Sequence, residues 1–173
     1  MSIRGLVFPL VAITLVTLGG CAADTAEDDA QPADDAAAEE ELRSTGITQL
    51  TVGRSTGFRP PPQPGKCHAS GRWTVDFAAK TIDAAACIDE RAGTLRRALS
   101  APEIARIRAA VAAVRVAPRP AACPADAPVS SLEVARGDKK FFYVEQRSAC
   151  GGSRAVTSAS ISALIDVMSA LPR

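Results

Sequence analysis

The residues best suited to chemistry in this sequence are five cysteines and a single histidine, His68, which directly follows Cys67. Cysteine beside histidine is typical of a thiol nucleophile with its base, or of a pair of metal ligands. Neither site is completed, because no C-x-x-C or H-x-x-x-H spacing supplies further groups and no G-x-S-x-G places a serine for His68. No phosphate loop or dinucleotide motif occurs either. We therefore expect no catalytic residue, no metal site and no cofactor.

A second cluster of interest lies in the segment 148–153. It contains Gly151 and Gly152, and Arg147 and Arg154 flank the glycines. The backbone N–H groups of such a loop can hold an anion, and the two guanidinium groups would add positive charge. An ordinary Gly-Gly turn that leaves a strand after a disulfide is the alternative. The sequence thus offers Arg147, Gly151, Gly152 and Arg154 as a candidate anion-binding site.

Cys21 stands at the end of an N-terminal segment that has the three parts of a secretory signal peptide. One positive charge at Arg4 is followed by an apolar run over residues 6–18 and by the small residues Gly19 and Gly20. As a helix, the apolar run would extend roughly 20 Å, whereas the hydrocarbon core of a bilayer is about 30 Å thick. The segment is therefore predicted to be a signal peptide and not a membrane span.

The sequence LGGC at residues 18–21 resembles the lipobox of bacterial lipoproteins, in which a Leu and two small residues precede an obligatory Cys. The resemblance covers residues 1–21. It implies cleavage after residues 1–20, a diacylglyceryl group on the Cys21 sulfur and acylation of the new amino group, and two or three acyl chains hold a protein stably on a membrane. In Gram-negative members of this family an Asp after the Cys directs retention in the inner membrane. Ala22 stands there, so the resemblance implies the outer membrane. The alternative to lipidation is an uncleaved anchor or a cysteine placed there by chance.

Charge is unevenly distributed along the chain, although the formal net charge is only +1. Residues 22–42 contain nine acidic side chains and no basic one, whereas residues 43–173 contain nineteen Lys and Arg against ten Asp and Glu. Like charge with low hydrophobicity favours a solvated chain, so residues 21–44 are predicted to be an acidic disordered tether, with an Ala/Glu-rich helix over 33–42 as the alternative. The basic remainder favours an acidic envelope glycan or protein as partner, or is simply a solvated basic surface. Nucleic acid is not expected, because no recognition motif accompanies the charge.

With Cys21 assigned to lipid, four cysteines remain, an even number that predicts two disulfides in an exported domain. Apolar side chains alternate over residues 73–77 and again over 82–88, which predicts a β-hairpin. A four-residue loop between the two strands places Arg72 opposite Cys87. Cys67 then lies within reach of Cys87, and we expect these two to pair.

The other two cysteines flank a second predicted hairpin. A two-residue Gly-Asp loop (137–138) joins two strands, favours a primed turn and pairs Leu132 with Tyr143. The open end of this hairpin brings Cys123 and Cys150 together, which predicts the second disulfide.

Two helices complete the predicted domain. Ser100 and Glu103 form a capping box ahead of an apolar stripe, and apolar residues with helical spacing recur over 161–171. Residues 47–52 are a candidate leading strand. The order hairpin, helix, hairpin, helix predicts a single α+β domain over residues 45–173, with a small antiparallel sheet, both helices on one face and two disulfides.

These features together favour a non-enzymatic lipoprotein of the cell envelope, attached to the outer membrane through lipid on Cys21. Its domain is expected to bind a protein or an acidic glycan. Two alternatives stay open. The disulfide-linked scaffold suits an inhibitor of secreted proteases, although no reactive loop is identifiable, and a small hydrolase or redox enzyme would need His68 or a free cysteine.

Overall fold

The computed structural model describes residues 32–43, 45–57, 62–88, 90–118, 120, 128–150 and 153–171. This part of the chain forms three α-helices and eight β-strands, with one short 3₁₀ turn. In chain order they are α1 (Pro32–Arg43), β1 (Gln49–Arg54), β2 (Ser70–Asp76), β3 (Thr81–Ile88), β4 (Arg91–Ala98), α2 (Ala101–Ala112), β5 (Val116–Ala117), β6 (Ser130–Arg136), β7 (Lys139–Glu145), η1 (Gln146–Ser148), β8 (Arg154–Val156) and α3 (Ser158–Ser169).

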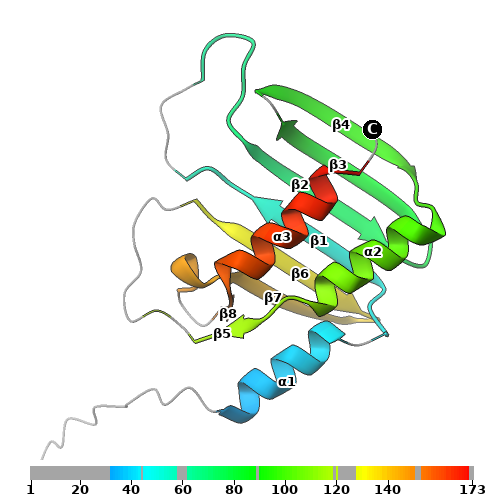
Figure 1. Ribbon diagram of the computed structural model, residues 1–173, viewed down its shortest axis with the longest axis vertical. Coiled ribbons are helices and arrows are strands. Elements are labelled where there is room, and N and C mark those ends of the chain that lie inside the picture. The colour runs from blue at the N-terminus through cyan, green and yellow to red at the C-terminus, as the bar shows by residue number, and fades with distance from the viewer. Residues whose placement is uncertain are drawn as a thin grey trace, which may run out of the picture.

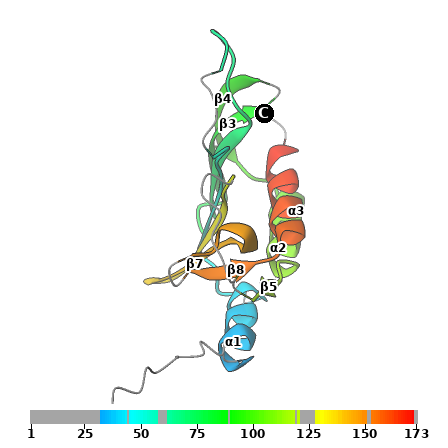
Figure 2. The same cartoon turned by 90° about the vertical axis from the view of Figure 1, so that its left-hand side faces the viewer.

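All eight strands belong to one sheet with the order β4-β3-β2-β1-β6-β7-β8-β5. The pairs are antiparallel except β7 with β8, which are parallel. Helices α2 and α3 pack together on one face of the sheet, and none of the described helices covers the opposite face (Figures 1 and 2). The α+β class predicted from the sequence is confirmed. The predicted small sheet with two helices is wrong in detail, since the sheet has eight strands and α1 is a third helix.

The candidate leading strand is the centre of the sheet. Strand β1 pairs with β2 on one side and β6 on the other, so it joins the two predicted hairpins into one sheet. Leu50 and Val52 point into the core, where both side chains are completely buried. Thr51 and Gly53 alternate with them and therefore face away from the helices.

The first hairpin, β2 and β3, is present, but its register differs from the predicted one. Arg72 lies opposite Ala85, and Cys87 lies opposite Ser70. The Asp76 carboxylate accepts hydrogen bonds from the two N–H groups of residues 78 and 79, at 2.9 and 2.8 Å. This carboxylate closes the turn one residue earlier than predicted. A shift of two positions leaves each side chain on its predicted face.

The second hairpin, β6 and β7, has the predicted register. Leu132 lies opposite Tyr143, and the two-residue loop has Gly137 at φ +58°. A positive φ at the first loop position is the property of a primed turn that glycine accommodates at no steric cost.

Helix α2 begins at the predicted cap. The Glu103 carboxylate accepts hydrogen bonds from the Ser100 N–H at 2.8 Å and from the Ser100 hydroxyl at 2.7 Å. Arg97, from the end of β4, donates two further bonds to it, at 2.6 and 3.2 Å. The cap thus also holds the edge strand β4 to the start of the helix.

We expect Glu103→Gln to reduce the stability of the protein at neutral pH. The Arg97 guanidinium, and after it the Ser100 N–H and hydroxyl, lower the pKa of Glu103 from its ordinary 4.5 to about 2. The unfolded chain therefore binds the proton more tightly than the folded one, and the stabilisation is complete above roughly pH 5 and lost as the pH falls towards 2. Urea midpoints between pH 7 and 2 should converge for wild type and variant. A gap that persists at pH 2, or appears equally in Glu40→Gln, would contradict this.

The acidic segment before the domain also differs from the prediction. Residues 32–43 form helix α1, close to the helix over 33–42 that the sequence left open as the alternative, so the folded part includes residues before the predicted start at 45. Ala38 and Leu42 are almost completely buried and join the main core. Residues 21–31 lie outside the described part of the chain. The apolar contacts of Ala38 and Leu42 offset the mutual repulsion of the acidic side chains.

Helix α3 follows the predicted spacing. Ile161, Leu164, Ile165 and Met168 are buried against the sheet, and Leu171 just after the helix is buried as well. None of the helices in the described ranges is long and apolar enough to cross a membrane.

Candidate functional site

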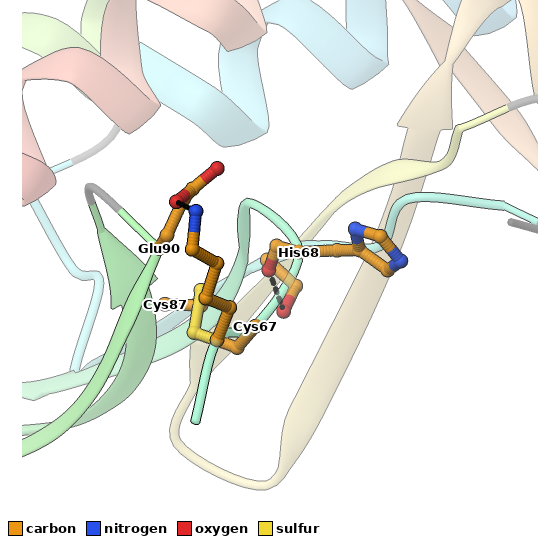
Figure 3. Close-up of a disulfide and its surroundings, with 6 residues drawn as sticks. Cys67, His68, Cys87 and Glu90 are labelled. Carbon is orange, nitrogen blue, oxygen red and sulfur yellow. Dashed lines mark hydrogen bonds and ion pairs between the residues drawn. A yellow bond between two sulfur atoms is a disulfide. The ribbon is translucent and has the colours of Figure 1, made fainter. Parts of the chain in front are cut away.

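The predicted cysteine pairs are the first test of the site predictions. Cys67 and Cys87 form a disulfide with a Cα–Cα distance of 5.9 Å, as predicted (Figure 3). Cys150 is also disulfide-bonded. Cys123, its predicted partner, and Cys21, the predicted lipidation site, lie outside the described residues.

His68 does not combine with Cys67 into a reactive pair. Figure 3 shows its imidazole pointing away from the disulfide, while its backbone carbonyl accepts a hydrogen bond from the Ser70 hydroxyl at 3.0 Å. The Cys67 sulfur is bonded to Cys87 and is not a thiolate. Across the described ranges, no group of three or more His, Cys, Asp or Glu side chains could hold a metal ion.

The predicted anion-binding loop is only partly described, because Gly151 and Gly152 lie outside the described residues. Arg147 is exposed in η1, whereas Arg154 lies on β8 and forms an ion pair with Glu41 of α1. The Arg154 guanidinium also lies over the ring of Tyr143, 5.9 Å from its centre. Arg154 therefore has an internal carboxylate as its partner and helps to hold α1 against the sheet.

A hollow lies on the face of the sheet opposite α2 and α3. It has a volume of about 290 Å³ and crosses β2, β1, β6 and β7. We call it the sheet hollow. Its lining residues are Thr51, Gly53, Arg54, Ser55, Gly71, Arg72, Val129, Ser131, Glu133 and Phe142.

The floor of the sheet hollow depends on Gly53. This residue lies opposite Arg72 on β2 and opposite Ser131 on β6. A Cβ atom at Gly53 would lie 2.7 Å from the Ser131 Oγ. The hollow therefore exists because the central strand carries no side chain at this position, while longer side chains surround it.

Several side chains that line the sheet hollow carry polar groups. Within the described part of the chain, Arg72 forms no ion pair and no side-chain hydrogen bond. The Glu133 carboxylate accepts from Lys140 at 2.9 Å, and the Thr51 hydroxyl lies 3.3 Å from that of Thr74. Arg72 thus shares the hollow with a carboxylate that Lys140 neutralises and with hydroxyl groups. Arg54 borders the hollow, but it alternates with Gly53 along β1 and its side chain leaves the strand on the other face.

An aromatic side chain stands at the rim. Phe142 on β7 lies opposite Glu133 on β6, and 51% of its surface is exposed. No other large hydrophobic side chain in the described ranges is so exposed. A single exposed hydrophobic side chain is common on protein surfaces, so Phe142 does not identify a site by itself, but its ring offers an apolar surface beside the polar groups of the hollow.

A second depression, more open and with a volume of about 480 Å³, adjoins the sheet hollow. It is lined by small side chains and the disulfide, through Cys67, Ser70, Ala85, Ala86, Cys87, Ala92, Gly93 and Thr94. Ala85 is the cross-strand neighbour of Arg72, so the depression continues from the sheet hollow across β3 to β4. We call it the disulfide strip.

The sequence does not indicate Gly53, Arg54, Arg72 or Glu133 as site residues. Their proximity arises from the pairing of β1 with both hairpins, which no local pattern reveals. Phe142 could have been found, since the predicted register of the second hairpin already directs its neighbour Tyr143 inwards and Phe142 outwards.

No protein-family model matches this chain, and a comparison with curated proteins finds no relative. The described residues form an α+β domain whose sheet is covered by helices on one face and hollowed on the other. The hollowed face is the candidate functional site.

Proposed function

We propose that this protein is a non-enzymatic lipoprotein of the bacterial cell envelope, and that its domain binds an acidic ligand, a protein or an acidic glycan. The observation that carries the proposal is Arg72, which lines the sheet hollow and has no acidic partner among the described residues. A guanidinium group matches a carboxylate or phosphate with two parallel hydrogen bonds. The remainder of the proposal rests on the N-terminal sequence.

Several independent features support an exported, anchored protein. The charged start, the apolar run and the LGGC junction belong to a lipoprotein signal peptide. The Cys67–Cys87 disulfide is compatible with an oxidising compartment. The net excess of basic side chains in residues 43–173 attracts acidic partners over distances of about 10 Å at moderate salt.

Replacement of Cys21 tests the anchoring. We expect Cys21→Ala to move the protein from the membrane fraction into the soluble envelope fraction and to abolish incorporation of labelled fatty acid, because the acyl chains have no other attachment point in the proposal. Ala22→Asp is the matched control, which should keep the lipid and move the protein to the inner membrane. Membrane retention of Cys21→Ala would contradict lipid anchoring.

Binding of either acidic class tests the second half. Purified protein should bind an immobilised polyglutamate peptide or an immobilised polyuronate at physiological salt, and Arg72→Ala should reduce that binding. Failure to bind either polymer would contradict the proposed function as a whole.

A further inference from the structure

We infer that the sheet hollow is a subsite for a carboxylate-bearing sugar unit, that is, a uronic-acid residue of an acidic glycan. The inference rests on the proposed function, and it selects the glycan over the acidic protein. Three features of the hollow support it: its size, the groups that line it and its continuation along the sheet.

The size favours a small unit over a protein surface. A volume of about 290 Å³ lies near the lower end of small-molecule sites, which span about 300–1,000 Å³. Stable protein–protein interfaces bury about 1,200–2,000 Å² and are centred on a well-packed apolar core. The open face has one exposed large hydrophobic residue within the described ranges, Phe142, so it lacks such a core.

The charges favour a ligand with one carboxylate and several hydroxyl groups. The Arg72 guanidinium supplies donors in the planar arrangement that a carboxylate accepts. The Glu133 carboxylate already has Lys140 as its ionic partner, so Arg72 is the charge that a single ligand carboxylate meets in the hollow. The Glu133 carboxylate can also accept hydrogen bonds from sugar hydroxyls, and the hydroxyls of Thr51 and Ser131 both donate and accept.

The aromatic rim completes the argument. A pyranose ring has polar edges and an apolar C–H face, and the exposed ring of Phe142 offers an apolar surface next to the polar walls. The arrangement therefore matches a uronic acid in both its charged and its apolar parts.

A chain longer than one unit has a continuous path. From the sheet hollow the face continues past Arg72 to Ala85 and into the disulfide strip, where the side chains are small. The strip is open and lined mainly by apolar atoms, so it accepts the next sugar without a steric barrier. A short oligomer is thus expected to bind more tightly than a single unit.

The test is isothermal titration calorimetry of the purified full-length lipoprotein in detergent with a short oligogalacturonate. The expected result is saturable binding, with a neutral oligosaccharide of equal length at least about tenfold weaker. Arg72→Ala should weaken binding about tenfold or more, as expected for loss of a charged, bidentate contact. Arg96→Ala is the matched control, because Arg96 lies on the same face, carries the same charge and pairs loosely with Asp83 at 4.0 Å outside the hollow. It should change the affinity by less than about twofold.

Gly53→Val separates shape from charge. Valine is favoured in strands and changes no charge, but its side chain fills the floor of the hollow. Gly53→Val should therefore weaken oligogalacturonate binding as much as Arg72→Ala does. Phe142→Ala, a change at an exposed site, provides the same comparison without crowding the sheet. Equal losses for Arg72→Ala and Arg96→Ala, or normal binding by Gly53→Val and Phe142→Ala, would overturn the inference.

The polyglutamate peptide distinguishes the two proposals. Binding of polyglutamate with no binding of oligogalacturonate would overturn the glycan inference and leave the proposed function standing with an acidic protein as ligand. Binding of neither probe would contradict both.

Discussion

Tyr143→Ala is expected to lower the free energy of unfolding by about 3–5 kcal/mol, the usual cost of truncating a buried aromatic side chain. The Tyr143 side chain has no exposed surface and belongs to the main core cluster. Its hydroxyl lies 2.9 Å from the Glu41 carboxylate and 3.2 Å from the carbonyl oxygen of Ala38, so it also connects β7 to α1. The variant loses apolar burial and the polar link together.

Tyr143→Phe isolates the polar part of that effect. It keeps the ring and removes the hydroxyl, and we expect a loss of about 1–2 kcal/mol, since Glu41 keeps its ion pair with Arg154. Burial in the core, and then the hydrogen bond to Glu41, raises the pKa of Tyr143. Because the folded pKa lies above the unfolded one, the stabilisation is complete below about pH 10 and is lost at higher pH.

Phe142→Ala is the matched control for Tyr143→Ala. The two residues are neighbours on β7 but occupy opposite faces, and Phe142 is half exposed. Its truncation should cost less than about 1 kcal/mol, measured by urea unfolding followed through circular dichroism. Equal losses for the two variants would contradict the assignment of faces on β7, and with it the placement of the sheet hollow.

Cys67→Ala/Cys87→Ala is expected to have the second-largest effect, a loss of about 3 kcal/mol. The disulfide closes a loop with a sequence separation of 20, and in the chain-entropy model such a closure removes that much freedom from the unfolded chain. Two further contacts join the segment before β2 to Glu90, between β3 and β4. One is the exposed Lys66–Glu90 ion pair (Figure 3), and the other is a hydrogen bond from the Cys67 N–H to the Glu90 carbonyl at 3.2 Å.

The loss should appear as a decrease of about 10 °C in melting temperature, measured by calorimetry without reductant. Lys66→Ala is the control for the neighbouring ion pair and should cost less than about 1 kcal/mol, because both partners are in contact with water. A melting temperature unchanged by the double replacement would show that the unfolded chain is already restrained in this loop.

The elements that the sequence predicted well are those whose signals are local. The capping box at Ser100 and Glu103, the apolar spacing of α3 and the Gly-Asp turn of the second hairpin each depend on residues within a few positions of one another. Helix caps and two-residue turns specify backbone geometry directly, so they need no distant partner. The first hairpin was predicted with its faces right and its register wrong, because the side chain of Asp76 decides where the turn closes.

Strands without a local signal were missed. β4 has the sequence RAGTLRRA, in which apolar and polar residues do not alternate. It is an edge strand, and none of its residues is buried. β5 and β8 have two and three residues, too few for a period to appear. Their strand structure depends on pairing with partners far away in the sequence.

Helix α1 shows how packing overrides composition. The acidic composition of this segment predicts a solvated chain. In the structure, Ala38 and Leu42 are buried in the core, and Glu41 contacts Arg154 and Tyr143. The favourable apolar burial and the basic partner exist only when the sheet is formed. Local sequence therefore favours the tether, and the folded state favours the helix.

By itself the sequence determined the α+β class, the charge imbalance and the Cys67–Cys87 pairing, because each follows from composition, a local pattern or one hairpin. The tertiary structure alone decided that β1 lies between the two hairpins. That placement brings Gly53 between Arg72 and Ser131 and leaves a hollow on the face that the helices do not cover. Residues far apart along the chain meet there because backbone pairing aligns whole strands, and no single strand carries the information about which neighbours it will have.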